Sequence, residues 1–346
     1  ISSKKKMKIY KVGGAVRDSL MGVKSSDNDW VVVGSSPEEM VSNGFKPIGK
    51  DFPVFLHPET NEEYALARTE KKTGTGYGGF TFYYGKDVTL EEDLSRRDFT
   101  INAIAQDDTD IIIDPFDGQD DIKNKLFRHV SDAFFEDPLR AIRLARFFSY
   151  DHLKDFDIDA STIECIEKIV SSREIADISS DRIWSETERA LSNSNPSKYF
   201  EKIISLNLLD PYFSKLTKSS CDSHNNKTLR WAELQINNDF QLGSELPLPN
   251  DFKNVVEVCK SALELNKDTN QDDLILLIDK INFVRNFGLI NQLISLPHFS
   301  DNKDFISQLA KKIKTTDFSY LSNVSKENIE EEKIKIYKEI INSKNE

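Results

Sequence analysis

Two aspartates near the start of the chain have the type and spacing of a metal site. Asp27 and Asp29 flank Asn28 and directly precede the apolar run 30–33. Alternate residues of a β-strand project to the same face, so the two carboxylates are expected to lie side by side. Adjacent carboxylates repel each other unless a cation lies between them, and hard oxygen ligands of this kind suit Mg²⁺. The pair predicts a divalent metal site, although an isolated pair of this kind is more often a solvated turn.

A glycine pair upstream indicates which reaction such a metal would assist. Gly13 and Gly14 follow an apolar segment, and Arg17 comes one helical turn later. Glycines let the backbone approach a triphosphate closely, and an arginine can neutralise phosphate charge. A metal beside a triphosphate favours attack of a hydroxyl on the α-phosphate, with pyrophosphate as the leaving group. The two motifs in this order therefore predict nucleotidyl transfer.

The elements that must hold these residues change character along the chain. Residues 7–120 alternate β-like segments with short helical segments that end at glycines. From about residue 121 onward, apolar residues recur at helical spacing. We predict an α+β fold with an N-terminal mixed β-sheet head (7–120), a helical neck (121–213) and a helical body and tail (214–346).

Some segments carry sharper structural expectations. The apolar spacing predicts one helix over 122–130 and another over 272–295. The stretch 214–250 is rich in Ser, Asn, Asp and Lys, which predicts an irregular connection. The glycine-rich stretch 68–80 is not expected to form regular structure. Residues 1–6 resemble a start-site variant and are excluded from the predicted fold.

Composition limits the classes of protein. The 346 residues are 38% hydrophobic and 30% charged, and no apolar stretch reaches the roughly 18–20 residues that a membrane span needs. Three cysteines without CxxC spacing favour a reducing compartment, so a cytoplasmic protein without a membrane partner is expected.

The net charge of −12 argues weakly against a nucleic-acid partner. Acidic residues are spread along the chain, however, whereas several arginines are concentrated in one region. A local basic groove on an acidic body is consistent with that pattern. The arginines of this region are Arg96, Arg97, Arg128, Arg140, Arg143 and Arg146.

The segments GGAVRD, DNDWVVVGSSPEEM and FPVFLHPETNEEYALART together resemble one protein family. They are similar to the class II branch of the polymerase-β nucleotidyltransferase superfamily, which contains tRNA nucleotidyltransferases and bacterial poly(A) polymerases. Within that branch the resemblance is closest to bacterial CCA-adding enzymes and extends from Met7 to about residue 200. In this family Asp27 and Asp29 would be both the catalytic residues and the metal ligands.

The resemblance also implies how the sugar is recognised. The segment 92–103 matches the second motif of the family, in which Arg97 and Asp98 contact the ribose. A carboxylate such as Asp98 can accept a hydrogen bond from a 2′-hydroxyl, so a deoxyribonucleotide would leave a polar group unpaired. On its own, the same triplet could be a capping aspartate beside two solvated arginines.

The segment 136–146 matches the motif that opens the neck helix in this family. Pro138 and Asp137 have the types of a first helical residue and its cap. By resemblance, Asp137 and Arg140 act as a protein template that pairs with the base edge of the incoming C or A. Arg143 and Arg146 are expected to hold the nucleotide or its phosphates. Without the resemblance, these arginines would be an exposed stripe on an amphipathic helix.

Three weaker expectations complete the site. The segment 181–186 resembles a motif that stabilises the neck helix, and Arg182 and Glu186 could equally form an ion pair with each other. The turn 114–118 resembles a hinge between head and neck. Glu63 is a weak candidate for a third catalytic carboxylate.

The resemblance implies a CCA tRNA nucleotidyltransferase. Such an enzyme adds C, C and A to the tRNA 3′ end from CTP and ATP without a nucleic-acid template, using two Mg²⁺ ions and releasing pyrophosphate. The loop 68–80 favours complete CCA addition over CC addition alone. The alternatives are an A-adding, CC-adding or poly(A)-adding enzyme of the same family and, from another class, a non-catalytic RNA-binding protein. Expected partners are tRNA, ATP and CTP, with no DNA and no membrane.

Overall fold

The computed structural model describes residues 7–25, 27–48, 54–74 and 79–343. Tertiary contacts divide the chain into two compact units. The first unit comprises Ile1–Glu186 and Lys202–Pro211, and the second comprises Thr187–Glu201 and Tyr212–Glu346. The predicted head (7–120) falls within the first unit, whereas the predicted neck (121–213) is divided between the two units, and the three-part division stays a prediction. Residues 1–6, which the sequence analysis excluded, lie outside the described residues.

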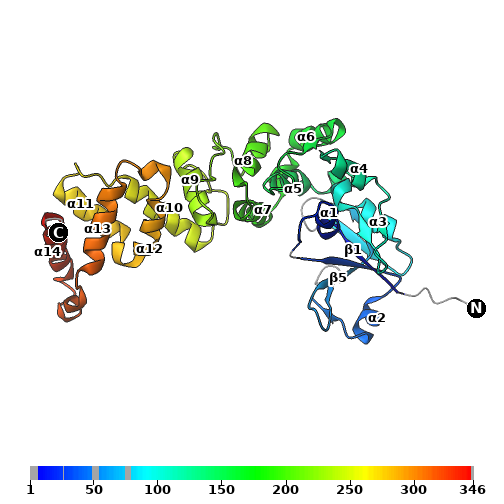
Figure 1. Cartoon of the computed structure of the whole chain (residues 1–346), viewed down its shortest axis with the longest axis horizontal. Helices are drawn as coiled ribbons and strands as arrows, with labels where there is room; N and C mark the ends of the chain where they lie inside the picture. The colour runs from blue at the N-terminus through cyan, green and yellow to red at the C-terminus, as the bar shows by residue number, and fades with distance from the viewer. Residues whose placement is uncertain (1–6, 26, 49–53, 75–78, 344–346) are drawn as a thin grey trace, which may run out of the picture. The chain divides into compact units, whose positions relative to one another are not determined.

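The first unit is built on a seven-stranded mixed sheet (Figure 1). Its spatial order is β3-β4-β5-β2-β1-β8-β9. Strands β2 and β5 run parallel, and the other neighbouring pairs are antiparallel. The strands are β1 (Lys8–Val12), β2 (Asp29–Val33), β3 (Lys46–Pro47), β4 (Val54–Leu56), β5 (Glu63–Leu66), β8 (Ala105–Gln106) and β9 (Ile112–Ile113).

The apolar residues of β2 cover both faces of this sheet because alternate side chains project to opposite sides. Val31 packs with Val12 and with Leu94 of α3 (Leu90–Ser95). Val32 packs on the other face with Met40 of α2 (Pro37–Ser42). The sheet is therefore buried between two layers, and a residue's place in the strand alternation decides which layer it faces.

Local signals set the ends of the short helices. Helix α1 (Gly14–Leu20) ends before Gly22, whose φ is +71°. Ser36 caps α2 by accepting a hydrogen bond from the Glu39 backbone, and the chain leaves that helix through Gly44. These helices and the strands before them agree with the predicted alternation.

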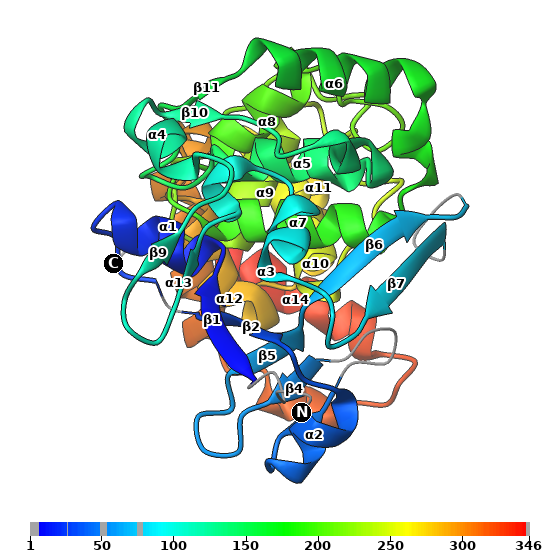
Figure 2. The same ribbon diagram turned by 90° about the vertical axis from the view of Figure 1, so that its right-hand side faces the viewer.

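The prediction of no regular structure over 68–80 is wrong for 68–72 and for Phe80. Strands β6 (Arg68–Lys72) and β7 (Phe80–Tyr84) pair in an antiparallel two-stranded sheet, which Figure 2 shows apart from the main sheet. The aromatic run of β7 favours a strand and gives β6 a pairing partner. The glycines are confined to the connection, of which 75–78 lie outside the described residues.

The helix predicted over 122–130 is wrong. The segment 122–130 does not form a helix: α4 (Gly118–Lys123) ends early, and β10 (Leu126–Phe127) pairs in parallel with β11 (Asp157–Ile158). Phe127 is fully buried against aromatic rings that include Phe99 and Phe148. The apolar residues near Phe127 in the sequence are explained by this packing and not by the face of a helix.

The remaining elements between 89 and 206 are helical. Helix α5 starts where Pro138 and Asp137 predicted it, and the Asp137 carboxylate accepts a hydrogen bond from the Leu139 backbone at 3.1 Å. The elements are η2 (Thr100–Asn102), η3 (Asp132–Glu136), α5 (Leu139–Phe147), α6 (Ala160–Ser172), η4 (Glu174–Asp177), α7 (Ser180–Ser192) and α8 (Pro196–Ser205), where η denotes a 3-10 helix.

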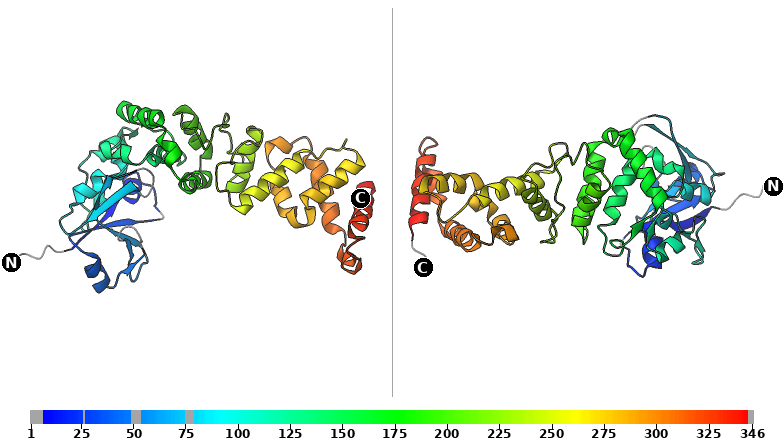
Figure 3. Two further views of the ribbon diagram at one scale, coloured as in Figure 1. Left: turned by 180° about the vertical axis from the view of Figure 1, so that it is seen from behind. Right: turned by 90° about the horizontal axis from the view of Figure 1, so that it is seen from above.

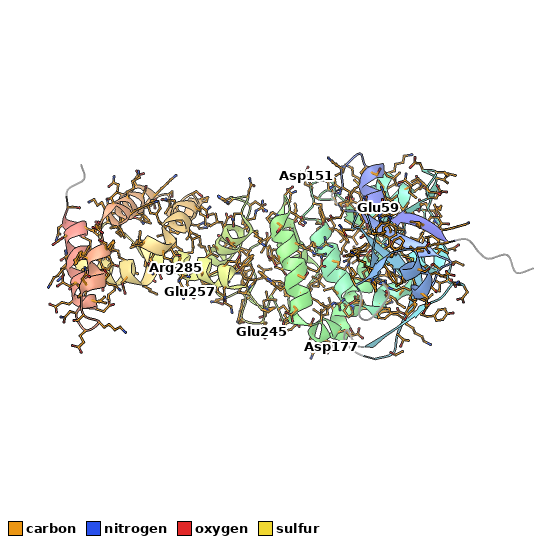
Figure 4. All side chains as sticks on the ribbon, turned by 90° about the horizontal axis from the view of Figure 1, so that it is seen from below. Glu59, Asp151, Asp177, Glu245, Glu257 and Arg285 are labelled. Carbon is orange, nitrogen blue, oxygen red and sulfur yellow. The ribbon has the colours of Figure 1, made fainter. Side chains whose placement is uncertain are left out.

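From Tyr212 onward, the described elements of the second unit are all helical, drawn yellow-green to red in Figure 3. Leucine and isoleucine side chains from most of its helices form one core, while Glu257 on α10 and Arg285 on α12 are exposed (Figure 4). Its elements are α9 (Lys227–Asn237), α10 (Asn250–Leu263), α11 (Gln271–Ile281), α12 (Phe283–Leu293), η5 (Pro297–Phe299), α13 (Lys303–Thr315), η6 (Ser319–Asn323) and α14 (Ile329–Asn342).

Two expectations about the second unit were wrong. The stretch 214–250 contains the helix α9, which begins at the cap Asn226 and buries Trp231 completely. The predicted single helix over 272–295 is two helices, because Asn282 adopts a left-handed conformation with φ of +51°. A left-handed residue ends one helix, and its side chain caps the next by accepting from the Arg285 backbone.

The fold class is confirmed as α+β, with a mixed sheet near the N-terminus and helices after it. Within the described residues, the structure contains no helix that is both long and apolar enough to span a bilayer.

Candidate active site

Strand pairing brings the glycine turn next to the first residue of β2. Val12, the last residue of β1, pairs with Asp29, so Gly13 emerges beside that aspartate. Gly13 has φ of +73°, a conformation that favours glycine, and its backbone nitrogen donates to the Ile104 carbonyl at 3.1 Å. The predicted neighbourhood of glycines and aspartates is therefore present.

Asp27 and Asp29 are both exposed. Asp29 opens β2 and shares the face of Val31, which is the face that packs on α3. Asp27 lies two residues before the strand, with its backbone carbonyl held by the Ser25 hydroxyl at 2.8 Å. Glu63 pairs with Asp29 across the parallel β2–β5 register, so it lies in the strand position next to that aspartate.

This carboxylate set fits a Mg²⁺ ion that also takes ligands from a substrate. Among the described residues, no group of three or more His, Cys, Asp or Glu side chains is arranged to hold a metal. Mg²⁺ is typically bound by one or two protein carboxylates, with water and substrate phosphates completing its coordination. Two exposed carboxylates beside a glycine turn meet that requirement.

Arg97 completes this side of the site. A Cβ built on Gly13 would lie 3.1 Å from Arg97 Nη1, so a side chain there would crowd the guanidinium. Arg97 Nη2 donates to Asp93 Oδ2 at a long 3.3 Å, and Arg97 Nε is buried without a hydrogen-bond partner among the described residues. The Arg97 side chain is 18% exposed, and its Nη1, beside the glycine turn, makes no hydrogen bond found in the described structure. We call the set Gly13, Gly14, Asp27, Asp29 and Arg97 the aspartate edge.

Asp98 points into the fold and is 6% exposed. Its Oδ2 accepts from Arg143 Nε at 2.9 Å, and its Oδ1 accepts from Asn102 Nδ2 at 3.1 Å. Burial alone would raise the pKa of Asp98, but the charge of Arg143 and the hydrogen bond from Asn102 outweigh it and lower the pKa to about 2. Asp98 is therefore ionised at neutral pH, as an acceptor for a sugar hydroxyl must be.

The predicted phosphate ligand Arg17 is buried, with 4% exposure. Its guanidinium donates to Asp18 Oδ1 through Nε at 2.8 Å and to Asn102 Oδ1 through Nη1 at 2.7 Å. It also lies 5.6 Å from the centre of the Phe147 ring. Its charge is compensated by Asp18, and a Cβ built on Gly14 would lie 3.4 Å from Arg17 Nη2, so this guanidinium lies beside the glycine turn. Its contact with a phosphate stays a prediction.

Arg143 and Arg146 differ although both lie on α5. The Arg143 side chain is 33% exposed, and its pKa is raised because the charges of Asp98 and Glu186 outweigh burial, which acts in the opposite direction. Arg146 is buried and bonded to Glu186 and, at 2.9 Å, to the Tyr150 hydroxyl. We call Arg17, Asn102, Asp98, Arg143, Glu186 and Arg146 the buried charge network.

The predicted base-reading pair is anchored at both members. Asp137 Oδ2 accepts from Arg182 Nη2 at 2.7 Å. Arg140 is 8% exposed and donates to the Ala133 carbonyl at 2.7 Å and to the Arg96 carbonyl. Arg182 thus contacts the cap of α5, and Glu186 contacts Arg146 farther along it. These contacts agree with the predicted role of 181–186 in stabilising this helix.

The sequence analysis assigned no role to Asn102, whose amide joins Arg17 to Asp98. Its position in the matched motif is a signal, but its partner Arg17 is 85 positions away along the chain. Phe147 was also missed: the guanidinium groups of Arg17, Arg143 and Arg146 lie 4.7–5.6 Å from its ring centre. Helical spacing could have indicated the contact between Arg143 and Phe147, but not the contact with the distant Arg17.

Two family models match the chain. Residues 9–128 match the poly A polymerase head domain, and residues 155–219 match the probable RNA and SrmB-binding site of polymerase A. The two matches confirm the resemblance predicted from the motifs.

Similar proteins carry consistent names. The CCA-adding enzyme of Coxiella burnetii (strain RSA 493 / Nine Mile phase I) is 57% identical over 194 residues, which are 56% of this chain and 51% of that protein. The multifunctional CCA protein of Aliivibrio salmonicida is 57% identical over 191 residues, 55% of this chain and 47% of that protein. The chain thus matches about half the length of these relatives.

Solved structures share the fold across nearly the whole chain. The Bacillus stearothermophilus CCA-adding enzyme in complex with CTP superposes with a TM-score of 0.69 at 23% identity, covering 97% of this chain and 89% of that one. The Thermotoga maritima CCA-adding enzyme complexed with tRNA gives a TM-score of 0.63 at 23% identity, covering 98% and 88%. At this identity the likeness establishes the fold alone.

Proposed function

We propose that this chain is a CCA tRNA nucleotidyltransferase, which adds C, C and A to the tRNA 3′ end from CTP and ATP. The observation that carries the proposal is the aspartate edge, where two exposed carboxylates, a glycine turn and an arginine with available donors meet. The 57% identity of the N-terminal part to proteins named for CCA addition supports the same conclusion.

The proposed metal is Mg²⁺, held by Asp27 and Asp29. A bound Mg²⁺ would make an attacking hydroxyl more acidic and offset negative charge at the reacting phosphate. Gly13 and Gly14 would let the backbone approach a triphosphate closely, and Arg97, whose Nη1 lies beside Gly13, would supply donors to its oxygens. Glu63 stays a candidate third carboxylate through its pairing with Asp29.

Asp98 is the proposed acceptor for the ribose 2′-hydroxyl, with Arg143 beside it. Asp137 and Arg140 are the proposed readers of the base edge. A guanidinium has five N–H donors, and the two carbonyl contacts of Arg140 leave donors for a base. The Asp137 carboxylate likewise keeps acceptor positions beyond its bonds to Arg182 and the Leu139 backbone. Their anchoring fixes the orientation in which a base would be read.

Transfer RNA is the proposed polymer substrate, and the cytoplasm the proposed compartment. The match of residues 155–219 to an RNA-binding family model supports the first, and three free, buried cysteines are compatible with the second. ATP and CTP are the proposed nucleotides. Residues 214–346 are proposed to form the tRNA-binding body and tail, and Arg146 is proposed to support the nucleotide site through α5.

Incubation of the chain with a tRNA that ends at the discriminator base, Mg²⁺ and single nucleotides tests this function. We expect two additions with CTP alone, one further addition when ATP is included, and none with GTP or UTP. A long A tail would identify a poly(A) polymerase, whereas addition of only A or only CC would identify a partial enzyme. Binding of tRNA without any incorporation would identify the non-catalytic RNA-binding alternative.

A further inference from the structure

We propose that Asn102 and Arg17 are positioning residues, which fix the carboxylate of Asp98 and thereby set the preference for ribonucleotides over deoxyribonucleotides. The inference rests on the proposed function, in which Asp98 accepts a hydrogen bond from the ribose 2′-hydroxyl. It gives Arg17 a role other than the predicted contact with the triphosphate.

Asn102 lies at the end of η2 and is 6% exposed. Its Oδ1 accepts from Arg17 Nη1 at 2.7 Å, and its Nδ2 donates to Asp98 Oδ1 at 3.1 Å. A guanidinium can only donate hydrogen bonds, and an ionised carboxylate can only accept them. The two neighbours therefore require one orientation of the amide, in which the NH₂ group faces Asp98.

Arg17 is itself held in place. Two of its nitrogens contact Asp18 Oδ1, at 2.8 Å from Nε and 2.7 Å from Nη2. His152 Nε2 lies 2.9 Å from the same oxygen. These contacts hold the guanidinium between Asp18 and Asn102, beside Gly14. The charge of Arg17 consequently acts on Asp98 through the amide of Asn102.

The two oxygens of Asp98 are used unequally. Oδ1 accepts from the Asn102 amide and from the Phe99 backbone at 2.9 Å, whereas Oδ2 accepts from Arg143 Nε alone among the bonds found in the described structure. Each carboxylate oxygen has about two acceptor positions. The remaining position therefore lies on Oδ2, beside the partly exposed Arg143. Asn102 prevents the carboxylate from rotating and keeps this oxygen available for a 2′-hydroxyl.

The substitution Asn102→Asp tests the proposal with almost no change of shape. It keeps an acceptor for Arg17 but places a second carboxylate against Asp98. On a tRNA ending at the discriminator base, we expect the ratio of kcat/KM for CTP to that for dCTP to fall about tenfold, the size of one hydrogen bond to a charged group. The loss should be confined to CTP, because dCTP lacks the hydroxyl. An unchanged ratio would overturn the proposal.

The matched control is Thr100→Val in the same 3-10 helix. Thr100 is 2% exposed, and its hydroxyl donates to Asp121 Oδ2 at 2.6 Å, away from Asp98. This variant should lose stability and keep the CTP to dCTP ratio. If the ratio fell as far as in Asn102→Asp, the effect would come from a loosened helix and the proposal would be wrong.

A double variant separates positioning from direct contact. Asp98→Ala alone should remove most of the preference for CTP, and adding Asn102→Asp should then change the ratio no further. An additional fall would mean that Asn102 acts independently of Asp98, which contradicts the proposal. Non-additivity of this kind is expected when two residues act through one contact.

Arg17→Lys provides a second route if Asn102→Asp does not fold. Lysine keeps the charge but lacks the planar fork with which Arg17 contacts Asp18 and Asn102 together. The ratio should fall severalfold with an unchanged circular dichroism spectrum, and an unchanged ratio in this folded variant would overturn the proposal. Failure of the unaltered chain to incorporate any nucleotide would instead refute the proposed function.

Discussion

The aspartate edge and the buried charge network differ in how exposed their charged groups are. At the edge, Asp27 and Asp29 are exposed, and Arg97 is 18% exposed with its Nη1 beside Gly13. In the network, Arg17 and Arg146 are buried and bonded to carboxylates or amides. Exposed groups can contact a substrate directly, whereas buried groups such as Arg17 and Arg146 hold other groups in place. Asp98 connects the two regions, because its Oδ2 keeps an acceptor position.

Removing the carboxylates of the edge should have the largest effect. Asp27→Asn and Asp29→Asn each keep the side-chain shape but lose the charge that would hold a cation, so we expect incorporation of CMP to fall by about a thousandfold or more. Asp120→Asn, at another exposed aspartate, should change little. Binding of tRNA should persist in all three variants. Retained incorporation in both edge variants would rule out the metal site.

The same incorporation assay tests whether Glu63 belongs to the metal site. This carboxylate pairs with Asp29 across neighbouring strands. A loss in Glu63→Gln as large as that in the aspartate variants would make it part of the metal site, and a loss of less than about tenfold would make it a neighbour only.

Breaking the buried network should instead affect stability. Glu186→Gln leaves Arg146 buried without its charged partner, and both side chains are 5% exposed, so we expect a loss of about 3–5 kcal/mol in unfolding free energy. The control is Glu188→Gln, whose partner Lys227 is 42% exposed. That variant should lose less than about 1 kcal/mol. Equal losses of unfolding free energy in urea titrations would show that the pair of Arg146 and Glu186 stabilises the fold no more than a surface ion pair does.

Replacing Arg97 should raise KM and leave stability almost unchanged, which distinguishes the edge from the network. Arg97→Ala removes donors that face the glycine turn, so KM for CTP should rise by roughly 10- to 100-fold, the range expected for hydrogen bonds to a charged ligand. Its long bond to Asp93 indicates a small effect on stability. Arg128→Ala, which removes a 44% exposed arginine paired with Asp121 and Asp159, is the matched control. An unchanged KM in Arg97→Ala would remove this residue from the site.

The sequence predicted those parts of the fold that depend on local signals. Strands β1 and β2 and helices α1 and α2 follow from short apolar runs that end at Gly13, Gly22 and Gly44. The elements that were missed depend on distant partners. Strand β6 is stabilised by pairing with β7, and Phe127 takes its place through packing on other aromatic rings.

The prediction of the site from the sequence was limited in the same way. Spacing indicated that Asp29 lies next to Gly13, because the pairing of β1 with β2 brings Val12 opposite Asp29. It did not reveal that Arg17 bonds Asn102, 85 positions away, or that Asp98 bonds Arg143, 45 positions away. A sequence motif indicates which residue types gather at a site. Whether an arginine there is available for a ligand depends on long-range contacts that the motif does not contain.

The pH dependence of stability should show the smallest effect, and it tests whether Asp98 belongs to the network. The folded pKa of Asp98 is about 2, below the ordinary value of 3.8, so its contribution is present above pH 4 and is lost as the pH falls toward 2. At pH 3 the loss relative to pH 7 should be about 1 kcal/mol. Asp98→Asn lacks a titrating group, so urea titrations at both pH values should give it a smaller acid loss by that amount. Equal losses of unfolding free energy in the two proteins would mean that Arg143 and Asn102 do not stabilise the ionised carboxylate. Asp98 would then not belong to the buried charge network.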